Sequence, residues 1–176
     1  MGKAAQNEHD QNSLYKRDPY TWALEQARAL RERRSAALDW DNVAEEIEDV
    51  GQRQRDKLTS YLARILQHLW KLSHWSSMRT RNQRIWRVEI DAYRDSAHQQ
   101  LRRNPGLKGS IEDIFADAWM EARRELARDA AKLAANDDYF TTFADRQVYP
   151  EDCPWTVEQA LDEDFWPDLE KNGNPT

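Results

Sequence analysis

Residues that break helices are scarce along this chain, which contains only 5 glycines and 6 prolines among 176 residues. Ala, Leu, Glu, Arg, Gln and Lys are abundant, and these residues lose little side-chain freedom in a helix. No linker rich in Gly, Ser or Pro divides the sequence. The sequence therefore predicts an all-α protein with a single helical domain over residues 14–168. We expect a mobile or disordered segment at residues 1–13 and a mobile tail at residues 169–176.

The apolar periodicity predicts a bundle of about five main helices and a short C-terminal helix. The first helix should begin after Asp18, whose carboxylate can accept from free amides, with Pro19 at the first helical position. It should end near Arg33. Its core-facing side is expected to comprise Tyr20, Leu24, Ala27 and Leu30.

The second helix should run through Val50, with Gly51 either ending it or lying at a bend. The third should extend from residue 52 to about residue 76, because leucine and isoleucine recur there at the helical period. This stripe consists of Leu58, Leu62, Ile65, Leu69 and Leu72. The remaining helices are expected after a polar loop at residues 76–82, over residues 111–135, and over residues 156–162. The last two each begin with a pattern that resembles a capping box, Ser110 with Asp113 and Thr156 with Gln159.

One acidic residue falls on the apolar side of the second expected helix. Val43, Ile47 and Val50 are spaced i, i+4, i+7 and should face the core, and Glu46 shares their side. An unpaired buried carboxylate is very costly, so Glu46 should either pair with a cation or lie at the edge of the stripe. The candidate partners in such a structural ion pair are Arg84, Arg87 and His68.

A metal site is a weaker alternative for the same region. It would combine Glu45, Glu48 or Asp49 with His68 or His74, since facing helices can house carboxylate and histidine ligands. A metal-dependent hydrolase would use Glu45, Glu48 and His68. The sequence lacks a Glu-x-x-His pair on one helix and a set of cysteines. We therefore expect no metal and no other cofactor.

The charges are distributed unevenly. Residues 53–103 contain 12 Lys or Arg and 4 Asp or Glu, whereas residues 137–170 contain 1 Arg and 11 Asp or Glu. One interpretation is that the acidic segment packs near the basic helices and neutralises them. The alternative is nucleic-acid binding, in which arginines contact phosphates and Trp75 and Trp86 stack on bases. The arginines nominated for that role are Arg79, Arg81, Arg84, Arg87 and Arg94.

Nothing in the sequence points to a catalytic residue. The lone Cys153 lies between Asp152 and Pro154, where its thiol pKa should be raised, and no Ser-His-Asp order or phosphate-binding Gly-rich loop is present. The single cysteine and the lack of a signal-like or membrane-spanning apolar run predict a cytoplasmic protein.

Several short motifs resemble those of a bacterial family known as domain of unknown function 29. The most specific is the Pro-x-x-Cys-Pro-aromatic-Thr-x-Glu-Gln order that begins at Pro150. The looser ones include Tyr15, Asp18, residues 20–22, 42–51, 66–69, 71–72 and 85–87, Ala118, Trp119, Ala122, Arg123 and the rest of 150–167. The resemblance implies a small helical domain of cyanobacteria and proteobacteria without an assigned activity, so it transfers no catalytic residue.

The leading functional hypothesis is a non-enzymatic interaction module that binds another protein. Eight tryptophans are more than a small protein needs for its core, and buried aromatics beside charge are common in interaction hot spots. Trp155 and Trp166 flank the terminal acidic helix and are candidate anchors. A homodimer formed through an aromatic helix face is one form of this hypothesis.

Overall fold

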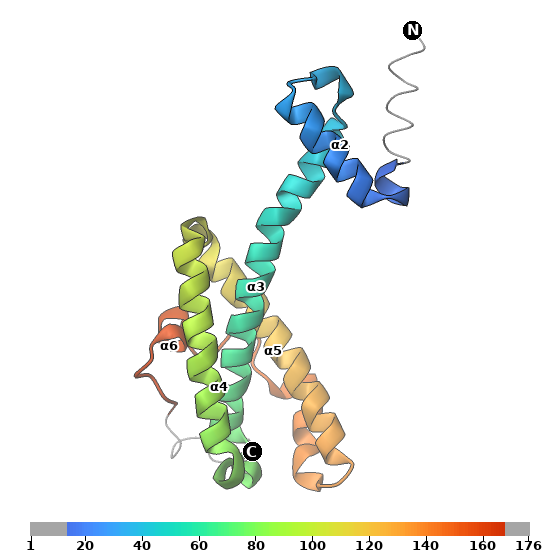
Figure 1. Ribbon diagram of the computed structural model, residues 1–176. Coiled ribbons are helices and arrows are strands. Elements are labelled where there is room, and N and C mark those ends of the chain that lie inside the picture. Colours follow the sequence, from blue (N-terminus) through green and yellow to red (C-terminus); the bar gives the residue numbers. More distant parts are fainter. Residues whose placement is uncertain (1–13, 168–176) are drawn as a thin grey trace. The chain divides into compact units, whose positions relative to one another are not determined.

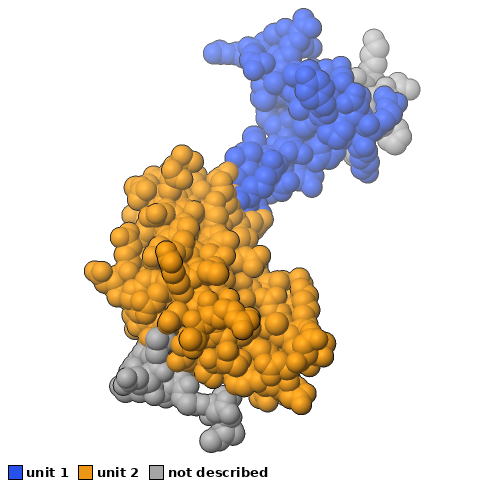
Figure 2. Space-filling view, turned by 60° about the horizontal axis from the view of Figure 1, so that its bottom comes forward, with its two compact units in different colours: residues 1–53 blue, residues 54–176 orange. Residues whose placement is uncertain are grey.

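The computed structural model describes residues 14–167 and shows the predicted all-α fold (Figure 1). No strand occurs among these residues. The expected mobile segments at 1–13 and 169–176 lie outside them. No helix in the described part combines the length and the apolar character needed to cross a bilayer. The chain divides into two compact units, residues 1–53 and residues 54–176 (Figure 2).

The first unit contains helix α2 (Pro19–Arg31), a 3-10 turn η1 (Ser35–Ala37) and the first turns of α3 (Trp40–His74). The predicted start of α2 is confirmed: the Asp18 carboxylate accepts from the Thr21 N–H at 3.1 Å, and Pro19 is the first helical residue. Beyond the helix, Arg33 adopts a φ of 55°. This left-handed conformation is typical of the residue that reverses the chain after a helix.

The expected buried side of α2 is wrong. Trp22, Gln26 and Ala29 are the buried residues, whereas Tyr20 is 75% exposed and Leu24 is 56% exposed. The side chain of Trp22 decides the orientation, because its large ring is buried while its indole N–H still finds an acceptor in Asp39. Tyr20 and Leu24, which share a side at i, i+4 spacing, therefore point away from the interior of this unit.

Helix α3 passes through Gly51 without interruption, so the second and third expected helices are one helix of 35 residues. Gly51 does not adopt a positive φ. A glycine inside a helix costs only about 1 kcal/mol relative to alanine, which the continuous helix on both sides offsets.

The second unit is built around α3 from Gln54 onward, α4 (Ser76–Arg103) and α5 (Ile111–Ala134) (Figure 1). The predicted leucine and isoleucine stripe of α3 is confirmed, because each of its five members is at most 1% exposed. Ile90 from α4 and Ile114 and Leu126 from α5 complete the same core. Each such side chain stabilises the fold by about 1.5–3 kcal/mol through its removal from water.

The polar loop expected at residues 76–82 is helical instead. Helix α4 begins at Ser76, and Trp75 alone separates it from α3. Tyr139 holds this tight junction: its hydroxyl donates to the carbonyl of His74 at 2.7 Å and accepts from the Ser76 N–H at 3.0 Å. A partner distant in sequence therefore supplies the bonds that a helix end leaves open.

Short 3-10 turns follow α5 and lead to the last helix, α6 (Val157–Leu161). The turns are η3 (Asp138–Phe140), η4 (Thr142–Ala144) and η5 (Arg146–Val148). The capping box predicted for α6 is confirmed, with Thr156 and Gln159 bonded reciprocally. The similar pattern at Ser110 is wrong, because that side chain makes no capping hydrogen bond.

Candidate functional site

A network of hydrogen bonds, rather than a large apolar core, joins α2 to the start of α3. The Asp39 carboxylate accepts from the Trp22 indole N–H at 3.2 Å and from the Asn42 amide at 2.7 Å. The Asp39 N–H donates to the Gln26 side chain at 2.9 Å. Trp22 also contacts the Tyr15 ring edge to face, with centroids 4.7 Å apart. These bonds fix the orientation of the two helices within the first unit.

Glu46 extends this network. Its carboxylate accepts from the Tyr15 hydroxyl at 2.9 Å and lies 3.4 Å from Nη2 of Arg53. The hydrogen bond to Glu46 is the main cause of a raised Tyr15 pKa. The Glu46 side chain is 41% exposed, so Glu46 lies at the edge of the apolar side of α3 and not in a core. The cation beside it is Arg53 of its own unit, whereas the nominated Arg84, Arg87 and His68 belong to residues 54–176.

The first unit exposes much of its apolar surface. Of the nine large apolar side chains that are exposed among residues 14–167, six lie in residues 14–53. They are Tyr20, Leu24, Leu30, Trp40, Ile47 and Val50. Only three residues of the same stretch, Trp22, Gln26 and Ala29, are buried. The expectation that Ile47 and Val50 face a core is wrong, since they are 67% and 56% exposed.

His68 lies on the buried side of α3 and pairs with Glu89 of α4. Its Nε2 is 3.2 Å from the Glu89 carboxylate. Burial, together with the nearby charges of Lys71 and Arg64, lowers the pKa of His68 to about 3. The ring is therefore neutral near pH 7, and with its proton on Nε2 it donates to Glu89. Nδ1 is buried and has no hydrogen-bond partner among residues 14–167.

The structure does not bring the metal-ligand candidates together as a cluster. Glu45 and Glu48 are exposed on α3 within the first unit, while His68 in the second unit contacts Glu89. Within residues 14–167 there is no group of three or more His, Cys, Asp or Glu side chains placed to hold a metal ion.

Arg94, nominated for phosphate contact, is instead fully buried at 0% exposure. Its guanidinium donates to three carbonyls of the C-terminal segment: Ala160 at 2.9 Å, Glu163 at 3.4 Å and Phe165 at 2.9 Å. Burial lowers the Arg94 pKa, and the carboxylates of Asp91, Asp162 and Glu163 oppose that effect. The acidic segment thus packs on the basic helix α4, and its backbone carbonyls rather than its carboxylates accept the hydrogen bonds of Arg94.

The other nominated arginines differ in their surroundings. Arg87 lies over the Trp166 ring, 4.6 Å from its centroid, and Arg94 lies 5.0 Å from the same centroid. Arg79 donates to the Ser73 carbonyl at 2.8 Å. Arg81 and Arg84 are exposed. Trp75 and Trp86, the proposed stacking residues, are 2% and 7% exposed and belong to the core.

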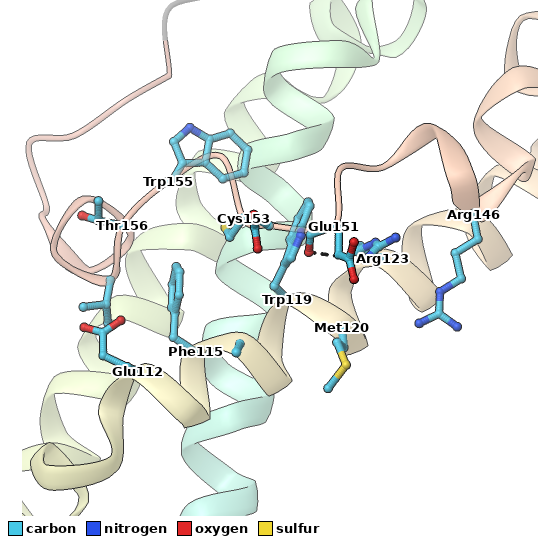
Figure 3. A pocket seen from close by; sticks show the side chains of 13 residues that line it. Glu112, Phe115, Trp119, Met120, Arg123, Arg146, Glu151, Cys153, Trp155 and Thr156 are labelled. Atoms are coloured by element: carbon cyan, nitrogen blue, oxygen red, sulfur yellow. Dashed lines mark hydrogen bonds between the residues drawn. The ribbon is translucent and has the colours of Figure 1, made fainter.

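A pocket of about 510 Å³ lies between α5 and the segment from Arg146 to Val157 (Figure 3). Phe115 and Trp119 of α5 and Trp155 of the segment supply its aromatic lining. Arg123 and Arg146 lie toward one end and Glu112 toward the other. This volume is in the usual range for small-molecule sites.

Hydrogen bonds to α5 hold the segment that forms the pocket wall. The Trp119 indole donates to the Pro150 carbonyl at 3.1 Å, and Arg123 donates to the Glu151 carbonyl at 3.4 Å. Cys153 also lines the pocket, and burial raises the pKa of its thiol to about 11. The expected direction for this thiol is right, but its main cause is burial and not the neighbouring Asp152. Such a thiol is almost entirely protonated at neutral pH, which makes it a poor nucleophile.

This pocket was not predicted from the sequence. The signal was present in the spacing of Glu112, Phe115, Trp119 and Arg123, which places the four on one side of a helix. The opposite wall coincides with the Pro150–Thr156 motif. Their proximity depends on the reversal of the chain through η3, η4 and η5, which no helical period reports.

The described residues define an all-helical protein with an exposed apolar surface on its first unit and an aromatic pocket on its second. The chain belongs to the family described as Domain of unknown function DUF29, whose family model matches residues 14–166. Neither a curated protein nor a solved structure matches the chain. The resemblance found in the sequence is thus confirmed, and the description of the family assigns no activity.

Proposed function

We propose that this protein binds another protein through the apolar surface of residues 14–53. The observation that carries the proposal is the concentration of exposed apolar side chains there: six of the nine among residues 14–167. Single exposed apolar residues are ordinary on a protein surface, whereas a gathering of them is typical of a binding site. Tyr20 and Trp40 are also of the residue types enriched in interaction hot spots.

The energetics of the first unit support the same conclusion. Among residues 14–53 it buries only Trp22, Gln26 and Ala29, and it relies on the hydrogen bonds around Asp39. Burying apolar surface against a partner contributes about 25 cal/mol per Å² before the costs of association. The side chains with the most to gain from a partner are therefore those that are more than half exposed: Tyr20, Leu24, Trp40, Ile47 and Val50.

Nucleic-acid binding through residues 53–103 is a second candidate with weaker support. Arg94 donates to three carbonyls, Arg87 lies over Trp166, and Arg79 donates to Ser73. Arg81, Arg84 and Arg87 are the exposed members of the nominated set, and Arg87 is the one that lies over Trp166. Phosphate affinity grows with the number of cations that reach the nucleic acid, and the contacts of Arg79, Arg87 and Arg94 within the protein therefore favour the protein-binding proposal over this one.

Site-specific photo-crosslinking tests the proposal. A benzophenone amino acid is placed at Tyr20 or at Ile47 in the full chain, which is then irradiated in the cells that naturally make it. We expect a discrete protein adduct from both positions, because both side chains would lie in the interface. Ile85 is the matched control, as it is an isoleucine 56% exposed on α4 of the second unit.

Adducts at positions 20 and 47 should also be lost when Val50→Asp is added, since a carboxylate in an apolar interface lacks a partner. The absence of protein adducts at both positions, or equal yields at position 85, would contradict the proposal.

A further inference from the structure

The exposed apolar residues at the start of α3 follow a spacing used by paired helices. Trp40, Val43, Ile47 and Val50 are separated by three, four and three residues, the a/d repeat of a two-stranded coiled coil. Three of the four are more than half exposed, and Val43 is partly exposed. We call this row the α3 seam. A seam of this kind is fitted to the side of another helix.

One flank of the α3 seam is made of small residues. Ala44 and Gly51, seven residues apart, lie at equivalent positions beside the seam, and both are exposed. Apart from Gly51 itself, its two chain neighbours and the adjacent backbone of the helix, no atom lies within 4 Å of the place where a Cβ on Gly51 would be. Small residues repeated along one flank let a second backbone approach closely, which increases the contact area that Ile47 and Val50 can bury.

The opposite flank bears one acid and one base. Glu46 and Arg53 are also seven residues apart, and their side chains are 41% and 62% exposed. In an antiparallel helix pair this flank would meet its own copy, so Glu46 would face the partner's Arg53 and Arg53 the partner's Glu46. In a parallel pair it would meet the flank of Ala44 and Gly51, which has no charge. The charges thus favour an antiparallel arrangement with two identical ion pairs.

The composition of residues 1–13 argues against that segment as the cover for the seam. Its apolar residues are only Met1, Ala4 and Ala5. These offer little apolar surface to match Trp40, Ile47 and Val50. A second copy offers the identical row, and a two-fold axis beside residues 47–50 brings Ile47 and Val50 of the two copies together.

We infer that the partner is a second copy of this chain, and that two α3 seams pack antiparallel with Glu46 of each copy beside Arg53 of the other. This inference rests on the proposed function, because it names the partner of the same surface. Ile47 and Val50 form the centre of the paired seams, with the small flanks in contact on one side and the two ion pairs on the other.

A charge-exchange experiment on the full chain tests this arrangement by sedimentation velocity over a concentration series. Glu46→Arg would place two arginines opposite each other in a homodimer, and Arg53→Glu would place two glutamates opposite each other. Each variant alone should dimerise about tenfold more weakly than the wild-type chain, or a change of about 1.4 kcal/mol. Mixed in equal amounts, the two should regain near wild-type affinity as a heterodimer, because both pairs are again opposite in sign.

Glu48→Arg is the control, since this exposed acid lies outside the two flanks of the seam. Circular dichroism on each variant shows whether it keeps its helices. Val50→Glu supplies a second test that does not depend on the Tyr15 hydrogen bond to Glu46, and it should also weaken the dimer.

The outcomes separate the inference from the proposed function. A wild-type chain that stays monomeric at all concentrations would overturn the inference, and crosslinks from position 47 to a different protein would leave the proposed function standing. A dimer whose two charge variants do not recover on mixing would overturn the antiparallel arrangement.

Discussion

Replacing Arg94 with methionine is expected to lower the free energy of unfolding by about 3 kcal/mol. The guanidinium is fully buried and donates to the carbonyls of Ala160, Glu163 and Phe165. Methionine fills much of the volume but leaves three acceptors without a donor, and each buried unsatisfied group is costly. Chemical denaturation measures the change. In limited proteolysis, the segment C-terminal to residue 157 should be cleaved at earlier times in the variant than in the wild-type chain.

Two further variants make this prediction specific. Arg94→Lys keeps the charge, but its single ammonium group does not reproduce the planar fork, so it should recover only part of the loss. Arg84→Met removes an exposed arginine from the same helix and should change stability by less than about 0.5 kcal/mol. Equal effects of Arg94→Met and Arg84→Met would contradict the role assigned to Arg94.

Trp119→Ala is expected to lower the free energy of unfolding by about 3–5 kcal/mol. Trp119 is 2% exposed and packs beside Trp70 and Trp155, with ring centroids 5.6 and 6.5 Å away. Alanine would leave a large cavity and remove the hydrogen bond to the Pro150 carbonyl. Thermal and chemical denaturation would measure the loss.

Met120→Ala is the matched control for Trp119→Ala. Met120 is the next residue of α5 and lines the same pocket, but it is 47% exposed. It should cost less than about 1 kcal/mol, because little apolar contact is lost. A stability unchanged by Trp119→Ala would contradict the assignment of Trp119 to the core.

The second unit was largely predictable from the sequence because its signals are local. The stripe from Leu58 to Leu72 repeats at the helical period, and all five of its members are buried. The capping pair of Thr156 and Gln159 is similarly local. Two predicted helix boundaries, the one at Gly51 and the loop at residues 76–82, do not occur in the structure. Glycine and polar residues disfavour a helix only weakly. At the junction of α3 and α4, the hydrogen bonds of Tyr139 outweigh that weak preference.

The candidate sites were harder to predict, because they depend on partners distant in sequence. Arginine is usually exposed, so nothing at Arg94 signals that its guanidinium binds three carbonyls more than sixty residues away. The apolar row at Val43, Ile47 and Val50 is a clear pattern, and the error lay in assigning it to a core. Periodicity identifies an apolar side of a helix but does not state whether the same chain covers it.

Hydroxyl-radical footprinting of the native full-length protein tests most directly the claim that the apolar surface of residues 14–53 binds a protein. The chain offers matched pairs of the same residue type: Ile47 at 67% and Ile85 at 56% exposure, and Val50 at 56% and Val88 at 62%. If the surface is an interface, Ile47 and Val50 should be oxidised several-fold more slowly than Ile85 and Val88. The protein must be isolated together with the molecules that it binds in its own cells. Equal oxidation rates of the two residues within each pair would then contradict the claim.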